Sequence, residues 1–131
     1  MKQKVHSVSY LAKAEFELKN GVYDLVALPA GAEVVKVSLE VVGGGPMTNG
    51  AVNVGFKDEP QKDYFLTLEN VLVLDNASRN FISSFTSSKD YTATSNKVVV
   101  AEVSAANGDD DNVKGVLRVL YFLPSVIEVE Y

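Results

Sequence analysis

The sequence has no cysteine, no tryptophan and a single histidine, and each absence removes a class of site. Without cysteine there is no disulfide framework, no thiolate metal site and no cysteine nucleophile. The histidine, His6, has no Ser/His/Asp spacing or G-x-S-x-G motif around it, so we expect an ordinary surface residue and no nucleophilic catalysis. Without tryptophan the chain lacks the strongest stacking platform for a sugar ring. We therefore expect neither an enzyme nor a cofactor.

Positive charge is also scarce, because 12 Lys and Arg face 17 Asp and Glu, for a formal net charge of −5. Such a chain lacks the cationic surface that phosphate backbones require, so nucleic acid is not an expected partner. No stretch approaches the run of about 20 apolar residues that a membrane helix needs. The basic amino terminus is not followed by the apolar core of a signal peptide. We expect a soluble protein with no membrane partner.

What the chain does contain is the alternation of apolar and polar residues typical of half-buried β-strands. It is clearest in residues 33–42, which follow a turn predicted at Pro29 and Gly31. Further strand-like segments are residues 13–19, 22–28, 51–56, 96–104 and 115–123. No window has a sustained helical period. The prediction is an all-β fold, an antiparallel β-sandwich of jelly-roll or Greek-key type, with residues 1–131 as one domain and 1–10 as an extended N-terminal arm.

Strand alternation also predicts which residues are buried and how neighbouring segments pair. The apolar faces predict a core made of Phe16, Leu18, Val35, Val37, Leu39, Val52, Val54, Leu117 and Val119. Asn20-Gly21 is a strong hairpin signal, so residues 22–28 are expected to return beside residues 13–19. Residues 67–90 are the least regular part, and we interpret them as a long excursion with short strands.

Carboxylates offer the other candidate chemistry. Asp109, Asp110 and Asp111 could supply oxygen ligands to Ca²⁺, but they lack the EF-hand spacing and are interpreted as a solvated hairpin tip without a metal. Glutamates that alternate with apolar residues are explained by a solvated strand face rather than by a glycosidase pair.

Four segments together resemble the small capsid decoration or cement proteins of tailed bacteriophages. They are residues 22–35 with their Leu-Pro-Ala-Gly-Ala turn, residues 52–55 leading to 63–66, residues 91–100 and residues 114–121. Two departures from the family pattern stand out. Phe56 follows Val-Gly where the family has an acidic residue, and residues 122–131 extend past the usual closing tyrosine.

The resemblance implies a protein of the virion, made in the host cytoplasm, that binds the outside of the assembled capsid and stabilises it by bridging capsomers. Its partners would be the major capsid protein and its own copies, most simply as a homotrimer. The alternative is a carbohydrate- or receptor-binding β-sandwich module of a phage or bacterial surface structure. The alternating apolar residues of the chain ends are the interface candidates: Val5, Val8, Tyr10, Val126, Ile127, Val129 and Tyr131.

Overall fold

The computed structural model describes residues 2–44, 50–69, 80–104, 113–123 and 126–130, and every regular element within them is a β-strand. In chain order the strands are β1 (Lys2–His6), β2 (Ser9–Glu17), β3 (Gly21–Leu28), β4 (Glu33–Gly44), β5 (Ala51–Phe56), β6 (Leu66–Leu68), β7 (Asn80–Thr86), β8 (Tyr91–Thr92), β9 (Lys97–Ser104), β10 (Lys114–Phe122) and β11 (Val126–Glu130). The predicted all-β class is confirmed.

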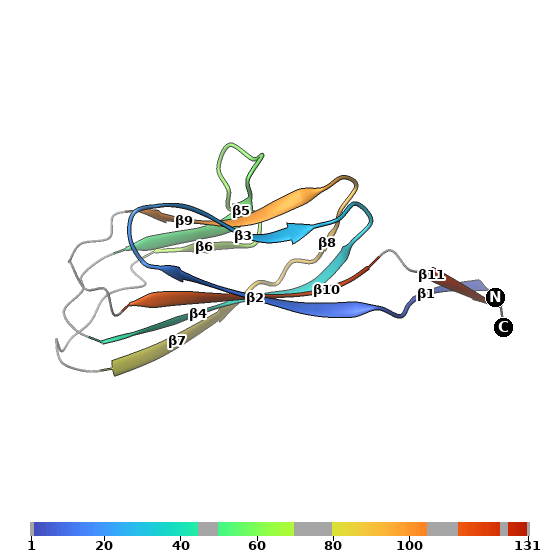
Figure 1. Cartoon of the computed structure of the whole chain (residues 1–131), viewed down its shortest axis with the longest axis horizontal. Helices are drawn as coiled ribbons and strands as arrows, with labels where there is room; N and C mark the ends of the chain where they lie inside the picture. Colours follow the sequence, from blue (N-terminus) through green and yellow to red (C-terminus); the bar gives the residue numbers. More distant parts are fainter. Residues whose placement is uncertain (1, 45–49, 70–79, 105–112, 124–125, 131) are drawn as a thin grey trace.

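Two antiparallel sheets face each other and a two-stranded ribbon extends from one end (Figure 1). One sheet has the order β2-β10-β4-β7, with β8 also paired to β4. The other has the order β3-β9-β5-β6. The ribbon is formed by β1 and β11, which pair with each other. This arrangement confirms the predicted antiparallel β-sandwich.

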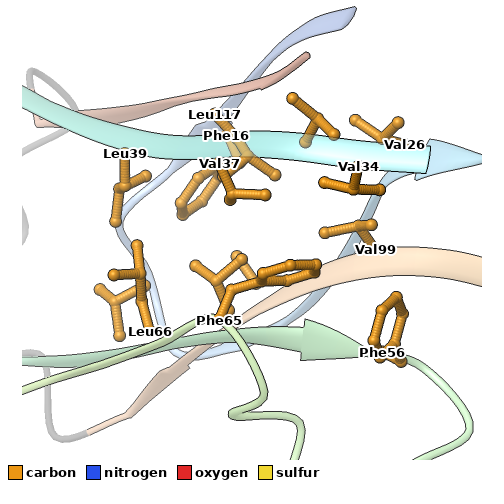
Figure 2. Close-up of a cluster of buried hydrophobic side chains, with 14 of the residues drawn as sticks. Phe16, Val26, Val34, Val37, Leu39, Phe56, Phe65, Leu66, Val99 and Leu117 are labelled. Atoms are coloured by element: carbon orange, nitrogen blue, oxygen red, sulfur yellow. The ribbon is translucent and has the colours of Figure 1, made fainter. Parts of the chain in front are cut away.

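The core lies between the two sheets, where apolar side chains from both inner faces meet (Figure 2). The buried members that the sequence predicted are Phe16, Leu18, Val37, Leu39, Val52, Val54, Leu117 and Val119. Burial of this kind stabilises by roughly 1.5–3 kcal/mol for each large apolar side chain, relative to leaving it exposed. No polar or charged side chain is buried among the described residues.

Val35 is the one predicted core residue that is wrong, because a β-bulge interrupts the alternation of β4. Leu120 of β10 pairs with Lys36, but the next residue, Tyr121, pairs with Val34, so Val35 has no partner of its own. The extra residue shifts the strand by one position. Val34 and Val37 therefore both point inward, and Val35 is left 49% exposed on the outer face.

The predicted hairpin at Asn20-Gly21 is also wrong, since the two strands that flank it belong to different sheets. β2 pairs with β10, and β3 pairs with β9. After β2 ends, the Leu18 amide still donates to the Val113 carbonyl at 3.1 Å, and the chain then crosses to the other sheet. The turn chemistry of Gly21, whose φ is +153°, serves a crossing connection as well as a hairpin.

The predicted turn at Pro29 and Gly31 is present and is tied to a distant part of the chain. The Ala32 amide donates to the Pro29 carbonyl at 3.1 Å, and Gly31 has a φ of +88°, which favours glycine. The Gly31 amide donates to the Ala93 carbonyl at 2.6 Å. The Ala30 amide donates to Oδ1 of Asn96 at 2.9 Å. Two of the segments that carry the family resemblance therefore meet at this turn.

The irregular region predicted over residues 67–90 holds a strand that its polar composition obscured. β7 pairs along β4, from Ser38 opposite Thr86 to Gly44 opposite Asn80. As an edge strand of its sheet it carries Ser and Thr, which the alternation of apolar residues did not reveal. Residues 71–74, whose apolar run could form one of the short strands of this excursion, lie outside the described residues.

Candidate interaction surface

The terminal ribbon, defined as β1 with β11, brings together the two ends that the sequence proposed as interface. The strands are antiparallel, with Val5 opposite Ile127 and Gln3 opposite Val129. Figure 1 shows the ribbon pointing away from the sandwich, at the end where β2 begins and β10 ends. Val5, whose side chain the structure describes, is exposed rather than part of the hydrophobic core. Tyr131 lies outside the described residues.

The register of the terminal ribbon divides its residues into an apolar and a charged group. Alternate residues of a strand share a face, and directly opposed residues share it too. The group that contains Val5 therefore holds Gln3, Ile127 and Val129. In the other group Lys2 is opposite Glu130 and Lys4 is opposite Glu128, so these two Cα pairings join opposite charges, and His6 is opposite Val126 at the root of the ribbon. An apolar group on one face of a ribbon is suited to packing against another apolar surface.

A short junction joins the terminal ribbon to the sandwich. The Leu123 amide donates to the Val8 carbonyl at 2.8 Å, just after β10. Nδ1 of His6, which is half-buried, lies 3.4 Å from the Leu123 carbonyl oxygen. These contacts hold the root of the ribbon beside the outer face of the β2-β10-β4-β7 sheet.

The exposed large hydrophobic side chains of the described chain gather at this same end. Their exposed fractions are 38% for Val5, 37% for Val8, 51% for Tyr10, 61% for Leu11 and 49% for Val35, and only Val22, at 47%, lies elsewhere, on β3. Scattered exposed apolar residues are normal, but a group in one place marks an interaction surface. Val5, Val8 and Tyr10 were interface predictions, and their exposure is consistent with that role.

Leu11 and Val35 belong to a larger surface, the outer patch, which we define as Leu11, Val35, Leu120 and Phe122. Leu11 lies opposite Leu120, and Leu120 lies opposite Lys36, next to the bulge. Two hollows indent this face. One of about 340 Å³ is lined by His6, Glu33, Val35 and Phe122. The other, of about 250 Å³, is lined by Leu11, Lys36, Ser38, Arg118 and Leu120.

Sequence reasoning missed the outer patch because its members come from three strands. The consecutive valines Val34-Val35 were a usable signal, since a doubled apolar residue between polar ones is what a bulge produces. Nothing in the sequence indicated that Leu11 and Leu120 are neighbours, because that follows only from the pairing of β2 with β10.

Charge at this end of the molecule is balanced, unlike that of the whole chain. Nη1 of Arg118 lies 3.6 Å from Oε2 of Glu40 at the border of the outer patch. The terminal ribbon and the border of the patch carry basic and acidic residues in equal number, namely Lys2, Lys4, Lys36 and Arg118 with Glu33, Glu40, Glu128 and Glu130. The acidic excess of the chain therefore lies elsewhere.

A third hollow, away from the outer patch, lies between β2 and β3, which are edge strands of the two sheets. Its volume is about 590 Å³ and its lining includes Phe16, Val22 and Tyr23. Nζ of Lys57 and Oδ2 of Asp24 form an exposed ion pair at 2.7 Å at its border. Val22 apart, the exposed large hydrophobic residues lie at the ribbon end, so this groove is the weaker candidate for an interface.

Most tyrosines of the described residues are used for packing against the core. Phe56, Tyr64, Phe65 and Tyr91 form a cluster in which the Phe56 and Tyr91 ring centroids are 4.5 Å apart. The Tyr64 hydroxyl donates to the Asp90 carbonyl at 2.8 Å. Phe56, which departs from the family pattern, is buried at the centre of this cluster, so here the position serves the core.

Charged side chains in the described part of the chain do not form a candidate metal site. No group of three or more His, Asp or Glu residues there is placed to hold a metal ion. Asp109, Asp110 and Asp111 lie outside the described residues, and the prediction made for them stays a prediction.

The Lys97 ammonium donates to Oδ2 of Asp58 at 2.6 Å. This hydrogen bond lowers the pKa of Asp58 and raises the pKa of Lys97.

Two solved phage capsid structures contain chains that are similar to this one. No helix among the described residues is long and apolar enough to span a membrane. No protein-family model matches the sequence, and neither does any curated protein. A chain in the cyanophage Pam1 capsid asymmetric unit has a TM-score of 0.65 and 18% identity, over 88% of this chain and 85% of that one, which shows a shared fold.

A much stronger match is a chain in the acidic stable capsid structure of Helicobacter pylori bacteriophage KHP30. Its TM-score is 0.85, and its sequence is 70% identical over 100% of both chains. Identity of this extent over the full length establishes common descent as well as a common fold. The chain therefore belongs to the same family of phage capsid-associated proteins as its relative in the KHP30 capsid structure.

Proposed function

We propose that this chain is a structural protein of a phage virion that binds the outside of the assembled capsid and stabilises it by bridging capsomers. The observation that carries the proposal is the match, at 70% identity and full length, to a chain of the KHP30 capsid structure. The resemblance of residues 22–35 and 91–100 to decoration proteins also supports it. These two segments, which are far apart in the sequence, meet at one turn of the structure.

The strand order supports the jelly-roll form of the two topologies that the sequence left open. The sheets β2-β10-β4-β7 and β3-β9-β5-β6 contain four strands each along their main paths, and successive strands mostly alternate between the sheets. Two four-stranded sheets linked in this way are the architecture of jelly rolls, which are common in viral capsid domains. We assign residues 1–131 to one such domain with the terminal ribbon as its arm.

The proposed partners are the major capsid protein and further copies of this chain, in the simplest case as a homotrimer at the virion surface. No catalytic step is required for this role. A protein that binds only the assembled lattice stabilises it by mass action, because disassembly must release the bound protein. Its surface is then the functional part of the molecule.

The carbohydrate-binding alternative gains no specific observation among the described residues. Tyr64 and Tyr91 are half-buried and belong to the aromatic cluster around Phe56. The Tyr23 hydroxyl donates to the Lys19 carbonyl at 2.7 Å. We therefore propose a single function.

The test is binding to shells from which the related protein has been removed. Purified protein is added to KHP30 capsids depleted of the matching chain, and binding is measured by co-sedimentation. We expect saturable binding to the assembled shell, a higher temperature of shell disruption, and added density on the outer surface by electron microscopy. The matched control is unassembled major capsid protein, to which binding should be much weaker. Absence of binding to the shell, or density only on its inner surface, would contradict the proposal.

A further inference from the structure

We propose that the outer patch receives the terminal ribbon of a second copy of this chain. The inference rests on the self-association proposed above, and not on binding to a shell. It names both surfaces of the contact: the ribbon group that holds Val5, Ile127 and Val129 on one copy, and Leu11, Val35, Leu120 and Phe122 on the next.

The terminal ribbon needs a surface to lie on. A two-stranded ribbon alone is at best marginally stable in water, because it has no third strand or helix to cover its apolar face. β1 and β11 pair only with each other, and Val5 remains 38% exposed. In the other group the two Lys–Glu pairs at the outer part of the ribbon suit a face that stays in water, and the pair of His6 with Val126 lies at its root.

The outer patch is suited in chemistry and in size. Its exposed members are aliphatic, and the bulge at Val35 adds an apolar side chain to a sheet face that would otherwise be more polar. Each ribbon strand has 5 residues, which corresponds to about 16 Å of length, and a pair of strands with its side chains is about 10 Å wide. The patch spans β2, β10 and β4, which is also about 10 Å. The hollows lined by Val35 and by Leu120 can accommodate side chains that project from the ribbon of the second copy.

The occupant is a second copy because the molecule's own ribbon points away. Figure 1 shows the ribbon continuing outward from the end of the sandwich, so it does not fold back onto the face beside its root. A rotation that places each ribbon on the next patch uses both surfaces of every copy and can close into a ring. Equal numbers of acidic and basic residues at this end mean that the net charge of −5 does not oppose the contact.

The first experiment measures association of the full chain by sedimentation equilibrium. We expect Leu11→Glu and Val35→Glu each to weaken association at least tenfold, since each places a charge within the apolar contact. The matched control is Val22→Glu, which alters an equally exposed valine on β3, outside the patch. It should change association by less than twofold. Thermal unfolding of all three variants verifies that the sandwich is intact, because the replaced side chains are exposed.

The second experiment exploits the absence of cysteine. Gln3→Cys protein, isotopically labelled, is mixed with unlabelled Val35→Cys protein under mild oxidation. We expect a mixed disulfide between the two copies, identified by its mass. Replacing Val35→Cys by Val22→Cys should reduce its yield at least tenfold.

The results separate this inference from the proposed function. A wild-type chain that stays monomeric at high concentration overturns the inference, even if it binds shells. Association that survives both glutamate substitutions, or equal cross-linking to both cysteine positions, also overturns it. Loss of association in the patch variants alone, with the mixed disulfide at Val35, supports it, even if the protein fails to bind shells and the proposed function is wrong.

Discussion

Residues of one strand can have opposite roles, and β4 illustrates this at close range. Leu39 is fully buried between the sheets, whereas Val35, four residues earlier, is exposed because of the bulge. Both are aliphatic, and the alternation in the sequence predicted both as buried. Their contribution to stability must therefore be measured rather than assumed from residue type.

Replacing Leu39→Ala should lower the free energy of unfolding by about 2–5 kcal/mol, because it removes buried contacts and leaves a cavity. Val35→Ala is the matched control and should change it by less than about 0.5 kcal/mol, as an exposed substitution. Denaturant unfolding at equilibrium measures both. Equal losses at the two positions would mean that the register of β4 is not the one described.

The Asp58–Lys97 pair predicts a small, pH-dependent contribution to stability. Its hydrogen bond lowers the pKa of Asp58, so the contribution is fully present above 3.8, the ordinary pKa of an aspartate, and is lost as pH falls through the lower folded-state pKa. Asp58→Asn should therefore lower the melting temperature slightly at pH 7, and the difference from wild type should shrink as the pH falls below this range. Melting curves across this range test it, and a difference that grows in acid would contradict the assignment.

Among the elements, the terminal ribbon stands apart from the sandwich. Its strands come from opposite ends of the chain and pair with each other in a sheet of their own. The crossing connection after β2 and the turn at Pro29, by contrast, tie the two sheets to each other and to distant segments. The ribbon is therefore the element that can be removed with least effect on the fold.

Deleting residues 1–7 together with 124–131 should weaken self-association at least tenfold while the sandwich still unfolds cooperatively. The loss in free energy of unfolding should be smaller than that of Leu39→Ala, because the core keeps all of its members. Sedimentation equilibrium and denaturant unfolding give the two readouts. A truncated chain that associates like wild type would show that the ribbon is not part of the interface.

The whole molecule is built as an apolar core with a functional surface. No described polar or charged side chain is buried, and ion pairs such as Lys97–Asp58 and Arg118–Glu40 are at the surface, where solvent screens them and each contributes little to stability. Under the proposed function, binding to an assembled shell would add stability to the shell rather than to the chain alone. At a free concentration a hundredfold above Kd the gain is about 2.7 kcal/mol per site, and a further tenfold increase adds about 1.4 kcal/mol.

Several features followed from the sequence alone because they depend on local chemistry. Alternation in residues 37–41 placed Val37 and Leu39 in the core, since a strand exposes alternate residues on opposite faces. The turn at Pro29 and Gly31 followed from residue types that favour its backbone angles. The resemblance to decoration proteins indicated a phage capsid-associated protein, which the KHP30 match confirms, and the decoration role itself stays a proposal.

Features that join distant residues were decided only by the tertiary structure. The bulge at Val35 arises because β4 must stay in register with β10, and the path after Asn20-Gly21 depends on whether β9 or β2 offers the available edge. The outer patch exists only once Leu11 lies opposite Leu120. Local sequence sets which backbone angles and faces a segment prefers, but pairing between strands far apart in the chain is a property of the assembled sheets, so the sequence identified the kind of protein and the fold positioned its surface.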